Sequence, residues 1–239
     1  MTLVAGPLTL GIMTDVYVNK DDYLQQKGDV LSKKVFVGGP VRVFERMGRS
    51  QLITLLHAGL YPHSKVLDIG CGCLRGGYWL IHFLDPGCYF GIEPNREMLE
   101  AGRDGLLEEG LLEAKQPRFD HHDDFGFSRF GVKFDFVIAR SIWSHASKSQ
   151  IEKMLDEFAA HAHPKSVFLA SYLRPSLMKR DYKGAGWVGK SHQSQEAGLV
   201  YHKLQWIAET CAGRGLEATE PGFEMFNGQR WLYITPKGR

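Results

Sequence analysis

The sequence has few cysteines, and their spacing fits neither a disulfide framework nor a structural zinc site. Only four occur among the 239 residues. Cys71 and Cys73 lie close together, but a zinc site of four ligands would need a second close pair, which the sequence lacks. We therefore expect free thiols, a reducing compartment and no bound metal.

Long apolar runs and a large excess of one charge are also missing. No segment reaches the about 18 apolar residues that a membrane-spanning helix requires. The apolar start, MTLVAGPLTLGIM, lacks the basic residues of a signal peptide. A formal net charge of +2 argues against a protein that coats nucleic acid. We predict a soluble cytoplasmic protein that needs no membrane.

Short apolar runs alternate with helical patterns along most of the chain. The hydrophobic content of 44% is sufficient for the core of one large domain, or of a domain with a cap. Asn227-Gly228 indicates a hairpin near the C-terminus. The alternation predicts an α/β fold with a doubly wound, mostly parallel sheet and an antiparallel C-terminal strand. Runs typical of buried parallel strands lie at 65–70, 88–93, 134–139 and 166–173.

Local residue patterns also predict where two helices begin and end. Pro40 suits the first position of a helix that ends near Gly59. Ser149 and Glu152 have the spacing of a capping box, and Pro164 ends the helix that they would begin.

We divide the chain into two parts on this basis. Residues 1–60 hold an N-terminal segment and a helix, and residues 1–35 could fold over a substrate as a lid. Residues 61–239 form the main domain. Within it, residues 174–198 are polar, basic and glycine-containing, and such a long connection is usually functional or disordered.

The stretch VLDIGCGCLRGG joins a buried strand to a glycine-rich turn. Gly70 and Gly72 leave the backbone free to bend sharply and to touch a ligand, and Asp68 lies on the strand itself. Glu93 follows about 20 residues later, a distance at which a carboxylate can accept hydrogen bonds from ribose hydroxyls. These features predict a cofactor that contains a nucleoside. A dinucleotide fits imperfectly, because Arg75 stands where G-x-G-x-x-G requires a third glycine.

Three motifs resemble those of class I S-adenosylmethionine (SAM)-dependent methyltransferases. They are VLDIGCG, GIEPN and FDFVIARSIWSH, within residues 64–173. The resemblance implies SAM as cofactor and a Rossmann-like sheet of seven strands, with residues 61–239 as the SAM-binding domain. It implies that the glycine-rich turn and the end of the second strand bind the methionine and ribose of SAM. The residues concerned are Asp68, Gly70, Cys71, Gly72, Glu93 and Pro94.

The same resemblance extends to the adenine side of the cofactor. In HHDDFGF, an acidic residue would meet the adenine amine and its neighbour would cover the ring. We choose Asp124 and Phe125, although Asp123 is nearly as well placed. Ala139 and Arg140, just after the fourth strand, would lie against the cofactor. Arg75 could either reach the carboxylate of the cofactor or be solvated.

Methyl transfer to a hydroxyl requires a base to remove the proton. His145 follows the fourth strand directly, and histidine titrates near neutral pH. The alternative for His145 is to cap or support the next helix, as a histidine at this position frequently does in the family resembled. We expect the substrate to be bound by Tyr172, Arg174, Trp187 and His192, of which Tyr172 and His192 are weaker alternatives for the base.

The leading hypothesis is a small-molecule methyltransferase, most plausibly one that methylates a hydroxyl of a metabolite or sugar. N-methylation of a small amine is the close rival, and methylation of RNA or another nucleic acid would need a longer basic track. A binding module that keeps the cofactor without catalysis, and a dehydrogenase, are further alternatives. The expected partner is a small-molecule acceptor, and the expected assembly is a monomer or a homodimer.

Overall fold

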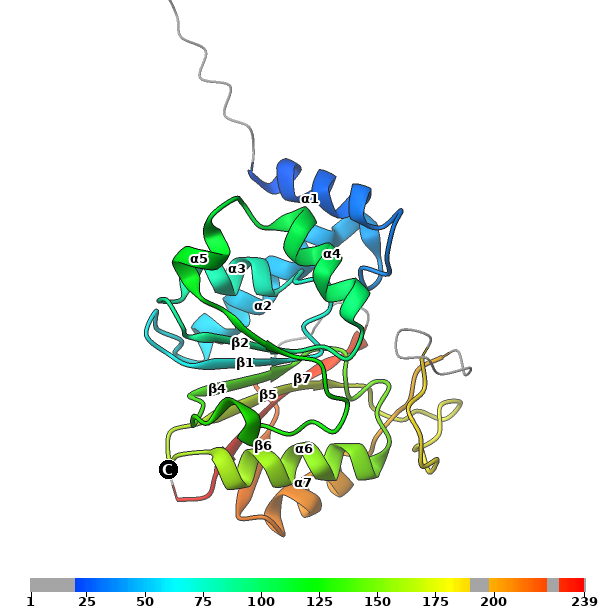
Figure 1. The fold of residues 1–239 in the computed structure, drawn as a ribbon. Helices are drawn as coiled ribbons and strands as arrows, with labels where there is room; N and C mark the ends of the chain where they lie inside the picture. The colour runs from blue at the N-terminus through cyan, green and yellow to red at the C-terminus, as the bar shows by residue number, and fades with distance from the viewer. Residues whose placement is uncertain (1–19, 190–197, 223–227, 239) are drawn as a thin grey trace, which may run out of the picture.

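A computed structural model describes residues 20–189, 198–222 and 228–238 of the chain. These residues form three layers, with a central sheet between two layers of helices (Figure 1). His192, Asn227 and residues 1–19 of the expected lid lie outside the described residues. The helices of the upper layer in Figure 1 are α1 (Lys20–Leu31), α2 (Phe44–His57), α3 (Gly77–Phe83), α4 (Arg96–Leu106) and α5 (Leu111–Lys115).

The sheet has seven strands in the order β3-β2-β1-β4-β5-β7-β6. Neighbouring strands from β3 to β5 are parallel, and β7 runs antiparallel to both β5 and β6. The predicted doubly wound, mostly parallel sheet with an antiparallel C-terminal strand is therefore confirmed. The strands are β1 (Val66–Ile69), β2 (Tyr89–Ile92), β3 (Arg118–Asp120), β4 (Phe136–Ala139), β5 (Val167–Tyr172), β6 (Leu216–Thr219) and β7 (Arg230–Pro236).

The central strands read as continuous apolar runs because helices cover both of their faces. In β1, Val66 packs into the core below the upper helices, whereas Leu67 and Ile69 pack into the core on the opposite face. This alternation follows from the two-residue period of a strand. The second core is covered by α6 (Lys148–His161) and α7 (Leu204–Ala212), which lie below the sheet in Figure 1.

Two helix starts show how local sequence determines the element boundaries. Asn95 caps α4, and its side chain accepts a hydrogen bond of 3.0 Å from the backbone N–H of Met98. The capping box of α6 is formed by Ser147 and Gln150. The predicted pair, Ser149 and Glu152, is therefore wrong by two residues, because this second pair of matching spacing already lies inside the helix.

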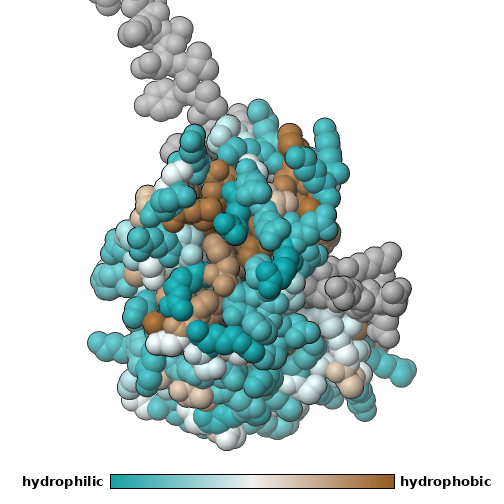
Figure 2. Space-filling view, in the orientation of Figure 1, coloured by the Kyte–Doolittle hydropathy of each residue, from teal (hydrophilic) through white to brown (hydrophobic). Residues whose placement is uncertain are grey.

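The N-terminal helices belong to the packed upper layer. The expected helix from Pro40 instead begins with a short 3-10 turn, η1 (Val41–Val43), and α2 follows from Phe44. Gly48 is required by close packing, since a Cβ there would lie 2.2 Å from the backbone oxygen of Arg75. Apolar side chains reach the surface mainly over this upper part of the molecule (Figure 2).

The expected C-terminal hairpin lies within residues 216–236. β6 and β7 pair antiparallel, with Leu216 opposite Pro236 and Thr219 opposite Tyr233. Asn227 itself lies outside the described residues. Within the described residues, no helix is both long and apolar enough to cross a bilayer.

Candidate functional site

The ends of β1, β2 and β4 meet at one edge of the sheet, where the order of strands reverses between β1 and β4. Ligands of doubly wound sheets bind at such an edge. A cavity of about 370 Å³ opens there. Its wall includes residues from all three strand ends and from the N-terminal part of the chain, among them Phe36, Gly38, Met47, Asp68, Gly70, Cys71, Gly72, Arg75, Glu93, Arg140, Ser141, His145, Leu173, Trp187 and Gln229.

The glycine turn after β1 has a backbone that other residues adopt only with strain. Gly70 and Gly72 have φ angles of 70° and 58°, in the left-handed region that glycine occupies readily. At Gly70, a Cβ would also lie 2.2 Å from a side-chain carbon of Ile142. The bare backbone therefore lets the segments after β1 and β4 approach each other beside the cavity.

Glu93 reaches back to this turn. Its side chain is buried, with the residue 1% exposed. One carboxylate oxygen accepts a hydrogen bond of 3.0 Å from the N–H of Gly72, and the other accepts one of 2.9 Å from the N–H of Asn95. Burial raises the pKa of Glu93 to about 7, although these two hydrogen bonds act in the opposite direction. A carboxylate oxygen has more than one lone pair, so both oxygens keep capacity to accept hydrogen bonds from a ligand.

Asp68 forms a second buried acidic group at the end of β1. Its carboxylate accepts a hydrogen bond of 2.9 Å from the hydroxyl of Tyr89 on β2. Burial raises the pKa of Asp68 to about 7, and the hydrogen bond from Tyr89 opposes this shift. The cavity thus has two carboxyl groups along its β1–β2 side, each held by a fixed donor.

Two arginines lie on the same cavity. Arg140 follows β4 directly and is 8% exposed. Burial, and then the positive charge of nearby Arg75, lowers the pKa of Arg140 to about 9. Arg75 is half-buried, and its guanidinium donates a hydrogen bond of 3.3 Å to the backbone oxygen of Gly39. In the part of the chain that the structure describes, neither guanidinium forms an ion pair.

His145 lies in the wall between β4 and the long loop that follows β5. Its Nδ1 is 2.6 Å from the backbone oxygen of Val188, and its ring stacks on Trp187 with centroids 5.6 Å apart. Burial lowers the pKa of His145, while backbone hydrogen bonds at Val188 and Gly198 partly offset this shift. With Nδ1 donating its proton to Val188, the neutral ring carries its lone pair on Nε2.

A second cavity, of about 600 Å³, adjoins the first and shares Gly70, Ile142 and Trp187 with it. Pro94, Asp123 and Phe125 line this second cavity. The shared residues place the two cavities side by side along the carboxyl edge of the sheet, with Glu93 lining the first and Pro94 the second.

Solved structures with a similar fold include methyltransferases. Magnesium protoporphyrin IX methyltransferase from Synechocystis PCC 6803, with bound SAM, aligns with a TM-score of 0.60 and 19% identity over 91% of this chain and 95% of that chain. A SAM-dependent methyltransferase from Clostridium acetobutylicum ATCC 824 aligns with a TM-score of 0.58 and 11% identity, over 92% and 99%. DesVI from Streptomyces venezuelae aligns with a TM-score of 0.57 and 16% identity, over 81% of this chain and 92% of that chain. These likenesses concern the fold.

Sequence comparison is more specific. A family model described as a methyltransferase domain matches residues 67–168, which contain the glycine turn, Glu93 and Arg140. This part of the chain therefore has the sequence pattern of a methyltransferase domain. No curated protein sequence matches the chain.

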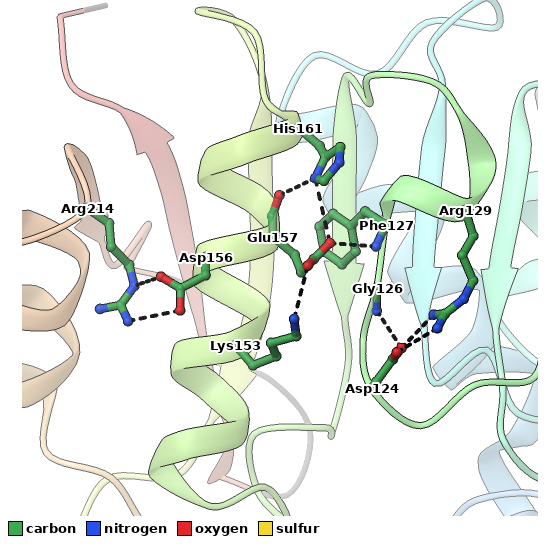
Figure 3. A network of polar contacts seen from close by, with 9 residues as sticks. All are labelled: Asp124, Gly126, Phe127, Arg129, Lys153, Asp156, Glu157, His161 and Arg214. Atoms are coloured by element: carbon green, nitrogen blue, oxygen red, sulfur yellow. Dashed lines mark hydrogen bonds and ion pairs between the residues drawn. The ribbon is translucent and has the colours of Figure 1, made fainter.

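In the structure, Asp124 does not take the place that the sequence indicated. Both of its carboxylate oxygens accept hydrogen bonds of 2.6 Å from the guanidinium of Arg129, and the N–H of Gly126 donates to one of them (Figure 3). This pairing holds the pKa of Asp124 well below its usual range. The neighbouring residue, Asp123, lines the second cavity with Phe125. Asp124 is therefore a structural residue of this turn, and Asp123 is the acidic residue that faces the site.

Figure 3 also shows why the segment after Asp124 is fixed. Glu157, from α6, accepts a hydrogen bond of 2.8 Å from the N–H of Phe127, and Lys153 and His161 lie beside the same carboxylate. The turn that carries Phe125 is thereby attached to the lower helical layer. Phe125 itself has a φ of 56°, so its backbone is strained in the manner common at ligand sites.

Two expected substrate residues are engaged elsewhere. The hydroxyl of Tyr172 donates a hydrogen bond to Glu220, and the guanidinium of Arg174 forms an ion pair with the same carboxylate. Neither residue lines the first or the second cavity. The placement of Tyr172 and Arg174 at the substrate is therefore corrected: both join the end of β5 to the segment after β6.

The remaining expected residues divide between the cavity wall and the core. Cys71 and Trp187 line the first cavity, and burial raises the pKa of the Cys71 thiol well above its ordinary value. Ala139 is fully buried among the core residues below the sheet. Ala139 thus supports the strand end from behind, and the residues that follow it reach the cavity.

Sequence reasoning missed several residues of the wall. Gln229, just before β7, donates a hydrogen bond of 2.8 Å to the hydroxyl of Ser141 and accepts one of 2.7 Å from that of Ser171. Ser171 in turn accepts a hydrogen bond from the N–H of Ser141. Ser141 has a φ of 59°, and this network holds it there. No local pattern in the sequence marks residues 36–40 or Gln229 as part of the site. No cluster of metal-ligating side chains occurs among the described residues.

Proposed function

We propose that the chain transfers the methyl group of SAM to a small-molecule acceptor, with a hydroxyl oxygen as the accepting atom. The observation that carries the proposal is that His145 and Glu93 line the same cavity, which has a volume of about 370 Å³. A concave space of this size suits a small acceptor beside part of the cofactor. A methyltransferase of similar fold from Synechocystis is named for magnesium protoporphyrin IX, which is also a small molecule.

The residues of both cavities fit the parts of SAM. Glu93 would accept hydrogen bonds from the ribose hydroxyls, because it lines the cavity and backbone donors fix its two oxygens. Asp123 and Phe125 would contact the adenine in the second cavity. Asp68, Gly70 and Arg75 would surround the methionine part in the first cavity. When bound, SAM supplies a methyl group on a positively charged sulfur.

His145 would remove the proton from the acceptor hydroxyl. Its lowered pKa keeps the ring neutral at neutral pH, and the hydrogen bond to Val188 directs the lone pair to Nε2. A histidine in this state can act as a general base. Residues 36–40 would close the other side of the cavity and help to exclude water.

The decisive experiment compares His145→Asn with the wild type in an assay that measures S-adenosylhomocysteine (SAH) formed from SAM with hydroxylated and amine acceptors. The asparagine amide can still donate to the oxygen of Val188 but cannot act as a base. We expect kcat on the hydroxylated acceptor to fall about 10²- to 10⁴-fold, with the affinity for SAH unchanged. His63→Asn, at an exposed position, is the matched control.

The outcomes separate the competing hypotheses. Full activity of His145→Asn on an amine acceptor would favour N-methylation, which needs less help from a base. His145→Asn and His145→Ala could both lower kcat and both speed proteolysis near Val188, which would show that the loop has loosened. That result would assign His145 a positioning role. Turnover of an RNA alone, with an affinity that decreases steeply with salt, would contradict a small-molecule acceptor.

A further inference from the structure

Arg140 is a buried positive charge that has no charged partner among residues 20–189, 198–222 and 228–238. Its Nε forms no hydrogen bond within the described residues, and one terminal nitrogen lies 3.3 Å from the sulfur of Met47. The side chain nevertheless lines the first cavity. Burial of an unpaired guanidinium costs free energy, because the charge loses its hydration without gaining an opposite charge. Such a group is stabilised when an anion enters the cavity.

Arg75 adds a second positive charge to the same wall. It donates to the backbone oxygen of Gly39 and lies over the ring of Phe44, with 5.8 Å between the guanidinium carbon and the ring centroid. Both arginines line the same cavity, and the positive charge of Arg75 contributes to the lowered pKa of Arg140. Neither arginine forms an ion pair with a carboxylate in the part of the chain that the structure describes. Asp68 and Glu93 line the cavity too, but they interact with Tyr89 and with backbone N–H groups.

SAM carries one carboxylate, so it can neutralise one of the two arginines. Arg75 comes from the loop that continues the glycine turn, next to Asp68 and Gly72, and is placed for the methionine part of the cofactor. Arg140 comes from the end of β4 and is followed by Ser141 and His145, which line the opposite part of the wall. A second anion is therefore needed beside Arg140.

We infer that Arg140 binds an oxyanion, a carboxylate or phosphate group, carried by the methyl acceptor. This inference rests on the proposed function, because it names the chemical class of the acceptor at the same site. Arginine suits the role, since its planar guanidinium can donate two parallel hydrogen bonds to such a group. The acceptor is thus an acidic hydroxylated small molecule. Neutral sugars would leave the charge unpaired, and cationic amines would be repelled.

The backbone around Arg140 is held in place before any ligand binds. Two hydrogen bonds hold Ser141: its N–H donates to the hydroxyl of Ser171 over 2.7 Å, and its hydroxyl accepts from the amide of Gln229 over 2.8 Å. The hydroxyl of Ser171 also donates to Gln229 over 2.7 Å, which joins the two supports. The residue that follows Arg140 is therefore fixed by β5 and by the segment before β7. A pre-positioned charge loses little entropy when it binds an anion.

The test uses two nucleoside ligands and a free anion. SAH contains the amino-acid carboxylate, whereas 5′-methylthioadenosine lacks it. Calorimetry gives the affinity of each, and titration of the SAH-saturated protein with inorganic phosphate measures the second anion site. The variants are Arg140→Met and Arg75→Met. Lys165→Met is the control, since Lys165 is exposed and precedes β5 at the opposite edge of the sheet.

We expect Arg140→Met to weaken phosphate binding at least tenfold and to leave the ratio of SAH to methylthioadenosine affinities unchanged. Arg75→Met should lower the SAH affinity at least tenfold relative to methylthioadenosine. Arg140→Lys keeps the positive charge but loses the planar guanidinium, so it should retain part of the phosphate affinity. This variant replaces Arg140→Met in the test if Arg140→Met fails to fold. Lys165→Met should match the wild type.

Two results would overturn the inference. One is a loss of SAH affinity in Arg140→Met, without a loss for methylthioadenosine, while phosphate binding persists. The other is SAH-saturated wild-type protein that binds no phosphate. In both cases SAH still binds, so the proposed methyltransferase function stands. Failure of the wild type to bind SAH at all would instead contradict the proposed function.

Discussion

The two sides of the first cavity bury charge in different ways. On the β1–β2 side, the carboxylates of Asp68 and Glu93 accept hydrogen bonds from Tyr89 and from backbone N–H groups. On the β4 side, Arg140 has no charged partner in the described part of the chain. The carboxylates of the first side therefore have hydrogen-bond donors within the protein, whereas the guanidinium of Arg140 has no anionic partner among the described residues. This difference underlies the two proposals that Glu93 binds the ribose of SAM and that Arg140 binds an anionic acceptor.

The largest expected effect tests whether backbone packing forms the cofactor side. In α4, a Cβ at Gly102 would lie 2.2 Å from the backbone oxygen of Cys73, inside the glycine loop. Gly102→Ala should lower the free energy of unfolding by about 1–3 kcal/mol and the SAH affinity more than tenfold. The measurements are urea unfolding and calorimetry.

Gly105→Ala is the matched control in the same helix. A Cβ there would make only an ordinary contact, at 3.5 Å, with a side-chain carbon of Leu31. Because alanine favours helix over glycine, this variant should gain about 0.5–1 kcal/mol of stability. Equal stability and SAH affinity in the two variants would show that the helix does not hold the glycine loop.

Glu93 tests the same side at the level of one side chain. Glu93→Ala removes an acceptor of charged hydrogen bonds, each of which contributes about 1.5–3 kcal/mol. We expect SAH to bind about 10- to 150-fold more weakly by calorimetry. Glu100→Ala, at an exposed position of α4, controls for the loss of a negative charge. An unchanged affinity in Glu93→Ala would remove Glu93 from the ribose site.

The smallest effect concerns the pH dependence of stability without added cofactor. Folding raises the pKa of Asp68 from 3.8 to about 7, so the folded protein binds a proton that the unfolded chain has released in this range. The associated stability is therefore present below pH about 4 and is lost as the pH rises to about 7. Asp68→Asn should make the fall in unfolding free energy shallower by up to about 1.4 kcal/mol per pH unit.

Denaturant titrations between pH 5 and pH 8 measure this slope. Asp104→Asn is the control, because Asp104 is an exposed residue of α4. Asparagine can still accept the hydrogen bond from Tyr89, which keeps the packing similar. If Asp68→Asn and the wild type had the same slope, burial of this carboxyl group would not affect its protonation.

Much of the fold and part of the site could be predicted from the sequence because they depend on short segments. The strands of the parallel sheet follow from apolar runs, and the pairing of Glu93 with the glycine turn follows from the spacing of about 20 residues. The capping box was misplaced by two residues, since Ser147 with Gln150 and Ser149 with Glu152 both fit the pattern. Local spacing does not tell which of two such pairs lies at the helix end.

The acceptor side was harder to predict for a physical reason. Tyr172 and Arg174 looked available in the sequence, but both pair with Glu220, about 50 residues later. Asp124 was preferred over Asp123, yet the turn directs Asp124 to Arg129 (Figure 3). Each of these outcomes depends on the direction of a side chain in a turn.

The sequence by itself determined the alternating fold, the SAM-binding motifs and the convergence of the glycine turn with Glu93, because each is encoded in a segment or in a fixed chain distance. Only the tertiary structure decided that Arg75 and Arg140 share one cavity, and that Gln229 holds Ser141 from 88 residues away. Those contacts join remote parts of the chain, and their energies depend on burial. Burial is a property of the assembled layers and is absent from any single segment.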